Sequence, residues 1–181
     1  MKIEETCEFI NYLETENQSC LKGFFKTIYN LPLTGNVSCY GDYPFVDKDL
    51  KNREKAYKDG EKCFMGYIQN NCNNTTLQYF NSENYKKFIR SASSDPSEFD
   101  CEDPVHGVEM IRCSTASAEL DRFKTMSDDI ENRLNRTFVT TILRTCRDVV
   151  SCGTNRCLFY KSDCERIELS KKCDMIEKEY L

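Results

Sequence analysis

Twelve cysteines and a single histidine are the residues of this 181-residue chain with the most distinctive chemistry. The number of cysteines is even, and none of them has the CxxC spacing that is typical of a zinc knuckle or of a thioredoxin-type redox pair. This pattern predicts that all twelve form disulfides in an oxidising compartment. The predicted disulfide cysteines are Cys7, Cys20, Cys39, Cys63, Cys72, Cys101, Cys113, Cys146, Cys152, Cys157, Cys164 and Cys173.

Asn-X-Ser/Thr sequons also indicate the secretory pathway, where N-linked glycans are added. The candidate glycosylation sites are Asn17, Asn36, Asn73, Asn74 and Asn135. Because the sequons at Asn73 and Asn74 overlap, we expect one glycan from that pair. Residues 1–5 have no apolar signal sequence. We therefore expect an extracellular protein, secreted or part of an ectodomain, whose signal peptide has been removed.

The overall charge excludes some classes of partner. The net charge is −5, and 30% of the residues are charged. This balance argues against a general nucleic-acid binder and against a binder of anionic membranes. No stretch approaches the roughly 18 uninterrupted apolar residues of a membrane-spanning helix, so we predict no transmembrane segment in this chain.

Apolar residues recur mostly at intervals of three and four, which is typical of helices, and no clear strand or hairpin pattern is present. Residues 16–31 are expected to form a helix that Pro32 stops, and residues 47–72 a helix that Gly60 weakens. A long apolar stripe over 117–150 and a final helix over 157–180 would form a helical hairpin that carries cysteines on both arms. We expect one all-α, disulfide-stapled domain of about five helices over residues 1–181.

The cysteine framework resembles a known family. The resemblance rests on widely spaced cysteines on predicted helices, a phenylalanine-rich first helix, and the segments CFMGYIQNNC (63–72) and CRDVVSCGTNRC (146–157). These features are similar to the cysteine-rich secreted domain of unknown function that is expanded in nematodes. The resemblance implies an extracellular, all-helical disulfide fold, and it implies no catalytic activity.

Three groups of polar residues were weighed as catalytic or metal sites. His106 follows Pro104 in a predicted loop with no nucleophile motif nearby, so we expect an exposed loop histidine. The acidic run over 95–103 lacks the spacing of a calcium-binding loop, so a solvated loop is the favoured interpretation. No pair of carboxylates is marked out for glycoside hydrolysis. We predict no catalytic residue, no metal and no cofactor.

Three functions stay open, and they differ in the surface that each requires. The first is recognition of a protein partner, unidentified from sequence, at a cell surface or in secreted fluid. The second is carriage of small apolar ligands, and the third is hydrolysis. An open apolar and aromatic surface would favour the protein binder, a closed apolar cavity the carrier, and a cleft with paired acids the hydrolase.

Overall fold

The computed structural model describes residues 16–35, 38–155, 157 and 163–180, and over these residues the chain is helical without a β-strand. The α-helices are α2 (Glu16–Thr34), α3 (Leu50–Asp59), α4 (Glu61–Asn71), α5 (Asn74–Phe80), α6 (Asn84–Ser93), α7 (His106–Met126), α8 (Ile130–Leu134), α9 (Arg136–Cys152) and α10 (Asp163–Tyr180). Short 3₁₀ turns occur at Cys39–Gly41 and Pro96–Glu98. The all-helical class is confirmed. The expected number of about five helices is wrong, because the described part alone contains nine.

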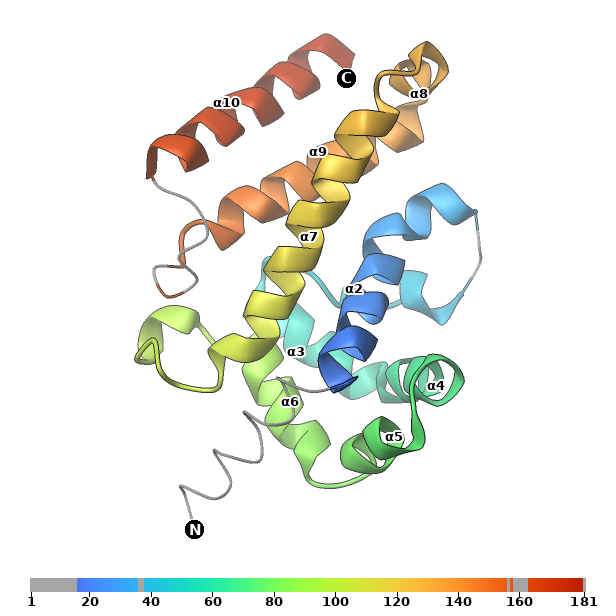
Figure 1. The fold of residues 1–181 in the computed structure, drawn as a ribbon, viewed down its shortest axis with the longest axis vertical. Helices are drawn as coiled ribbons and strands as arrows, with labels where there is room; N and C mark the ends of the chain where they lie inside the picture. The colour runs from blue at the N-terminus through green and yellow to red at the C-terminus, as the bar shows by residue number, and fades with distance from the viewer. Residues whose placement is uncertain (1–15, 36–37, 156, 158–162, 181) are drawn as a thin grey trace.

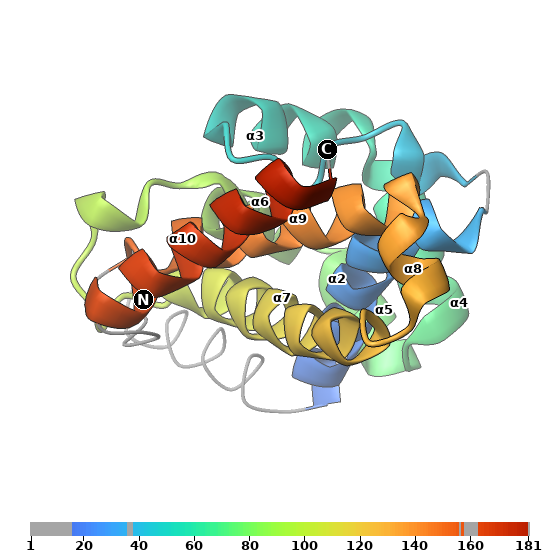
Figure 2. The same ribbon diagram turned by 90° about the horizontal axis from the view of Figure 1, so that it is seen from above.

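Two long helices, α7 and α9, lie side by side at the centre of the molecule (Figure 1). Helix α10 packs on α9, while α2 packs on both α7 and α9. Helices α3 to α6 form the other part of the molecule, in which α3 packs on α6 and α6 reaches α7. Figure 2 shows α10 alongside α9, with α7 running obliquely to α10 and α8 at one end. None of the helices in the described part is long and apolar enough to cross a membrane.

The predicted helix over 47–72 is two helices, which meet at Gly60. A Cβ atom at this glycine would lie 2.8 Å from Cγ of Tyr43 and 2.9 Å from Cζ of Phe45. Only a residue without a side chain therefore allows the loop before α3 to pack on this junction. The Asp49 side chain caps the start of α3 by accepting from the backbone N–H of Lys51 at 2.9 Å.

The apolar stripe over 117–150 is likewise divided, between α7, α8 and α9. Asp129 accepts from the backbone N–H of Glu131 at 2.9 Å, and Asn135 accepts from that of Phe138 at 3.2 Å. Such side-chain caps satisfy N–H groups that have no partner at the start of a helix. The periodic pattern was read as one helix because the apolar spacing continues across both caps.

Pro32 lies inside the last turn of α2 and does not stop the helix at that point, as we had expected. Proline has no N–H, so the carbonyl four residues earlier, that of Ile28, loses its helical donor. The guanidinium of Arg144 approaches this carbonyl at 3.4 Å and that of Tyr29 at 3.5 Å. A side chain from α9 thus compensates for the proline.

His106 is buried, with 4% of its surface exposed, and it is the first residue of α7. The prediction of an exposed loop histidine is therefore wrong. The preceding turn folds back on the helix start, and the ring Nε2 lies 2.9 Å from the carbonyl oxygen of Asp100. The Asp103 carboxylate accepts from the N–H of Val105 at 2.9 Å, which fixes this turn.

Ten of the twelve cysteines form disulfides within the described part of the chain. The pairs are Cys20–Cys72, Cys39–Cys63, Cys101–Cys157, Cys113–Cys152 and Cys146–Cys173. Cys7 lies outside the described residues, as does the side chain of Cys164. The pairing of all twelve cysteines thus stays a prediction. The Cys146–Cys173 bond joins α9 to α10 and closes the expected helical hairpin.

Candidate binding groove

A half-open groove of about 700 Å³ runs along α9, and it is larger than two further hollows of about 320 and 460 Å³. Its opposite wall is made by the end of α2 and by residues 40–48, and we call it the α9 groove. The apolar residues that line it are Ile28, Leu31, Tyr40, Tyr43, Pro44, Phe45, Val46 and Leu143. Its size falls within the range of about 300–1,000 Å³ that is typical of ligand pockets.

The loop wall of the groove is anchored at both of its ends. The Cys39–Cys63 disulfide ties the residue just before this wall to α4. Phe45 is fully buried, and its ring centroid lies 5.3 Å from that of Phe24 and 5.0 Å from that of Tyr57. These anchors hold the wall in place, so that the groove exists before a ligand binds.

The other wall is one face of α9. Thr140, Arg144 and Asp148 all line the groove. They follow one another at intervals of four, which places them on the same side of a helix. This face carries both apolar and charged side chains. The contacts that each charged side chain already makes within the protein therefore determine which ligands the groove can bind.

Asp148 is already paired inside the protein. Its side chain is 10% exposed, and Arg112 donates to it at 2.5 Å. The hydroxyl of Tyr29 also donates to Asp148. Burial raises the pKa of this tyrosine, and the neighbouring carboxylate raises it further. Asp148 is therefore a partner of buried groups rather than an acid that is free to transfer a proton to a substrate.

Arg147 is also compensated within the chain, by two carboxylates of α10. It donates to Asp174 at 2.7 Å and to Glu177 at 2.8 Å. These contacts raise the pKa of Arg147. Arg147 and Glu177 both line the groove, and this exposed cluster contains one cation and two carboxylates.

Arg144 differs from both of these residues. Its guanidinium donates to the two backbone carbonyls of Ile28 and Tyr29 on α2, and no carboxylate in the described part of the chain forms an ion pair with it. Removal from water lowers the pKa of Arg144, and this effect is opposed by Tyr29 and by the charge of Asp148. The guanidinium therefore has donors that are not used by an anion of the protein itself.

A smaller hollow of about 320 Å³ continues the groove along α9 towards Pro32. It shares Thr140 and Arg144 with the groove, and its other lining residues include Arg136. The charged residues that line this hollow are the two arginines, and no carboxylate does. This end of the α9 face is consequently cationic, although the whole chain is acidic.

Behind the groove lies a buried ion cluster that is centred on Arg112. Its guanidinium donates to Glu109 at 2.5 and 3.0 Å, and Arg53 donates to the same carboxylate at 3.2 Å. The two cations lower the pKa of Glu109 against the opposing effect of its burial. The cluster joins α3, α7 and α9, so it supports the groove without lining most of it.

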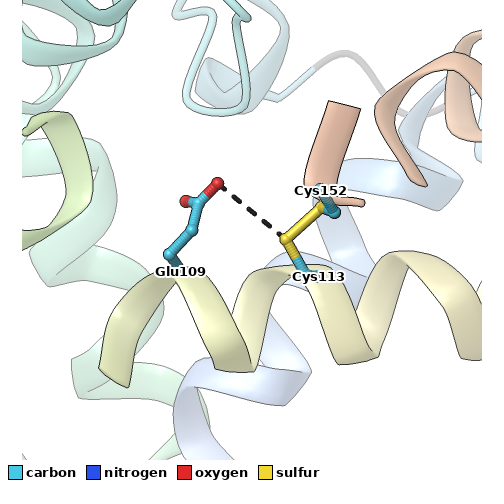
Figure 3. Close-up of side chains that lie close together, drawn as sticks. All are labelled: Glu109, Cys113 and Cys152. Atoms are coloured by element: carbon cyan, nitrogen blue, oxygen red, sulfur yellow. Dashed lines mark hydrogen bonds between the residues drawn. A yellow bond between two sulfur atoms is a disulfide. The ribbon is translucent and has the colours of Figure 1, made fainter. Parts of the chain in front are cut away.

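Glu109 also lies beside the Cys113–Cys152 disulfide (Figure 3). Ligand-type atoms of these three residues lie within 4.8 Å of one another, as they would in a metal site. Both sulfur atoms are bonded to each other, however, and a metal would require thiolates. The 3.8 Å approach of Glu109 to Cys113 is a contact without a donated proton, because a disulfide sulfur carries none.

The structure argues against one predicted glycosylation site. Asn17 is 7% exposed, and its side-chain oxygen accepts from the hydroxyl of Thr76. A glycan on the amide nitrogen would have no room here, so Asn17 is corrected to a buried residue that joins α2 to α5. The sequon could not indicate the burial of Asn17, because it depends on residue types alone. Asn36 lies outside the described residues.

The remaining sequons are exposed. Asn73 and Asn135 are helix caps whose side-chain oxygens accept from the N–H groups of Thr76 at 2.8 Å and Phe138 at 3.2 Å. Because a glycan is attached to the nitrogen, the cap and the glycan are compatible. Asn74 is exposed at the first position of α5. Occupancy of these three sites stays a prediction.

The acidic segment over 95–103 uses its carboxylates locally. Asp95 accepts from the backbone N–H of Ser97 at 2.9 Å and from its hydroxyl at 2.7 Å. These bonds lower the pKa of Asp95. With Asp103 bonded to its own turn, the segment is held by its own side chains, in keeping with the interpretation as a loop.

Sequence reasoning missed the groove entirely. Its two walls are about 100 residues apart in the chain, and neither contains a recognised motif. The four-residue spacing of Thr140, Arg144 and Asp148 was visible, but their neighbours across the groove were not.

The comparisons with known proteins cover the first part of the chain. A family model described as "Domain of unknown function (DUF19)" matches residues 1–102. No curated protein and no solved structure matches the chain. The matched segment includes the loop wall of the groove, whereas α9 lies beyond it.

Proposed function

The chain belongs to the family described as Domain of unknown function (DUF19), and from its structure we propose an extracellular, non-catalytic module that receives a segment of a protein partner in the α9 groove. The observation that carries the proposal is a preformed, half-open groove whose walls combine apolar, tyrosine and arginine side chains. Tyrosine and arginine are enriched among the residues that dominate the energy of protein interfaces.

The rigidity of the walls supports binding. The loop wall is fixed by a disulfide and by the buried ring of Phe45, and α9 is fixed by two further disulfides. A surface that is already ordered loses less conformational entropy when it binds a partner. An open groove also admits a segment of a larger protein, which an enclosed cavity would not.

An extracellular location is supported by the five disulfides. Such bonds persist in oxidising compartments and are reduced in the cytosol. The exposed sequons at Asn73, Asn74 and Asn135 agree with passage through the secretory pathway.

The test is to fill the groove without disturbing the core. Thr140 is exposed, lines both hollows, and bonds only to a carbonyl of its own helix. Thr140→Trp should therefore block the groove and leave the free energy of unfolding nearly unchanged. Gln78→Trp, an exposed position on α5 outside the groove, is the matched control. Proteins captured from extracellular fluid of the source organism are compared by quantitative mass spectrometry.

We expect at least one protein that the unchanged chain and Gln78→Trp capture equally and that Thr140→Trp loses. If every captured protein is retained by Thr140→Trp, the groove is not the interface and the proposal is wrong.

Carriage of a small apolar ligand is the second candidate, and the groove volume of about 700 Å³ favours it. A carrier would retain lipid through purification. Organic extraction of the secreted protein followed by mass spectrometry should then find a lipid in near-stoichiometric amount, and Thr140→Trp should remove it.

A further inference from the structure

We propose that the partner segment in the α9 groove is both acidic and apolar, with a carboxylate bound by Arg144 and apolar side chains in the wider part of the groove. This inference rests on the proposed function and names the chemistry of the partner. It depends on which charges of the groove are already compensated and on where the apolar lining lies.

Charge complementarity is the first support. Asp148 and Arg147 each form an ion pair within the protein, whereas Arg144 forms none with the described residues and donates to backbone carbonyls. Bonds between a guanidinium and a carboxylate are shorter and stronger than those to a neutral acceptor. A carboxylate that arrives on a partner can therefore gain more at Arg144 than at any other charged residue of α9 that lines the groove.

The position of Arg144 is the second support. It lies where the wide, apolar groove meets the smaller hollow, since it lines both. On one side are Leu31 and Leu143 of the apolar lining, and on the other is Arg136. A partner segment that runs along α9 would thus place its apolar side chains in the wide groove and an adjacent acidic side chain at Arg144.

A second acid on the partner would strengthen binding. Arg136 precedes Arg144 by eight residues, which corresponds to about 12 Å along a helix. No carboxylate in the described part of the chain forms an ion pair with Arg136. Two carboxylates at that separation could therefore each bind an arginine of the same helix face.

The experiment uses three matched pools of short, capped, fluorescent peptides in which leucine and phenylalanine surround a central glutamate, glutamine or lysine. Fluorescence polarisation gives the dissociation constant for the unchanged chain, Arg144→Gln and Lys55→Gln. Lys55 is exposed on α3, outside the groove, so its variant loses the same unit of charge elsewhere. We expect the glutamate pool to bind about tenfold more tightly than the glutamine pool, as one charged hydrogen bond implies.

The preference for glutamate should vanish in Arg144→Gln, persist in Lys55→Gln, and weaken as salt concentration rises. Equal binding of the three pools, or no binding by any of them, would overturn the inference. Binding of dodecanoate is measured in the same way. If the unchanged chain binds dodecanoate but no peptide, and Arg144→Gln does not bind dodecanoate, the site is assigned to a lipid anion. That result would also overturn the inference.

Thr140→Trp separates this inference from the function on which it rests. If Thr140→Trp abolishes peptide binding while Arg144→Gln keeps the glutamate preference, the groove binds a protein segment but not through this arginine. If peptides bind equally to Thr140→Trp and to Gln78→Trp, the groove itself is not the interface.

Discussion

Residues 16–100 and residues 101–180 are stabilised by different means. In the first region, aromatic rings from α2, α3, α4, α5 and α6 form one continuous cluster. Phe64 is at its centre, fully buried, with five ring centroids within 6.0 Å. These rings belong to Phe24, Tyr57, Phe80, Tyr85 and Phe88. Offset-stacked and edge-to-face pairs of this kind add to the hydrophobic effect of burying the rings.

The second region has few such contacts. Phe123 and Phe138 form the one ring pair described there, with centroids 6.2 Å apart. Three disulfides join its segments, compared with two in the first region: Cys101–Cys157, Cys113–Cys152 and Cys146–Cys173. Even its buried positions include polar residues, such as Thr141 and Thr145, whose hydroxyls donate to carbonyls one turn earlier. The second region therefore depends less on aromatic packing than the first, which combines its ring cluster with the Cys20–Cys72 and Cys39–Cys63 bonds.

No described disulfide connects the two regions. They share one apolar core, in which α2 packs on α7 and α9, and polar contacts also join them. Arg53 pairs with Glu109, and Tyr29 bonds to Arg112 and Asp148. We call these contacts the polar seam. The α9 groove lies along it, with its loop wall from the first region and α9 from the second. The shape of the groove therefore depends on how the two regions sit together, which the shared apolar core and the polar seam fix jointly.

The largest effect should follow from removing the centre of the seam. Arg112→Met leaves Glu109 and Asp148 buried without their main cation, and breaking a buried pair in this way costs about 3–5 kcal/mol. The free energy of unfolding is measured by chemical denaturation. Arg147→Met is the control, because its pairs are exposed and should contribute at most about 1 kcal/mol. Similar losses in the two variants would contradict the importance of the seam.

Phe64→Ala tests the aromatic region. Removing a fully buried phenylalanine costs about 3–5 kcal/mol, because it combines lost burial with a cavity. Hydrogen exchange should show the largest loss of protection in α3 to α6, while α10 keeps its protection. Phe99→Ala, at a half-buried loop position, should cost clearly less. If α10 loses as much protection as α4, the two regions do not differ in the way described.

The double variant Cys146→Ala and Cys173→Ala tests the disulfide region. The bond closes a separation of 27 residues, for which the chain-entropy model gives about 3–4 kcal/mol. We expect hydrogen-exchange protection to fall mainly in α10, because the principal packing of this helix is on α9. A uniform fall across the molecule would instead show that α10 supports the aromatic region.

Acid should weaken the seam by a smaller and graded amount. The pKa of Glu109 is lower in the folded state than its ordinary value of 4.5, so its contribution to stability is present above that value. The contribution is lost as the pH falls through the folded pKa, because the proton then binds more tightly to the unfolded chain. Denaturation at a series of pH values should show a shallower acid dependence for Glu109→Gln. An unchanged slope would mean that this carboxylate does not control the acid response.

The sequence by itself determined the class of structure and its chemistry of stabilisation. Apolar spacing of three and four is a local property, so the helix expected over 16–31 lies close to the observed bounds of α2, Glu16–Thr34. The cysteine count indicated disulfides, although their partners depend on which helices meet. The helix caps at Asp129 and Asn135 were not predicted, because the apolar stripe continues across both of them.

Tertiary structure decided everything that depends on contacts between distant residues. Gly60 divides a helix because the Tyr43–Phe45 loop packs on it, and Pro32 is tolerated because Arg144 reaches the end of α2. Asn17, which was expected to carry a glycan, is a buried residue. His106, which was expected in an exposed loop, is buried at the start of a helix. The α9 groove arises in the same way. Its walls are about a hundred residues apart, and only the packing of α2 against α9 brings Arg144 beside an apolar surface.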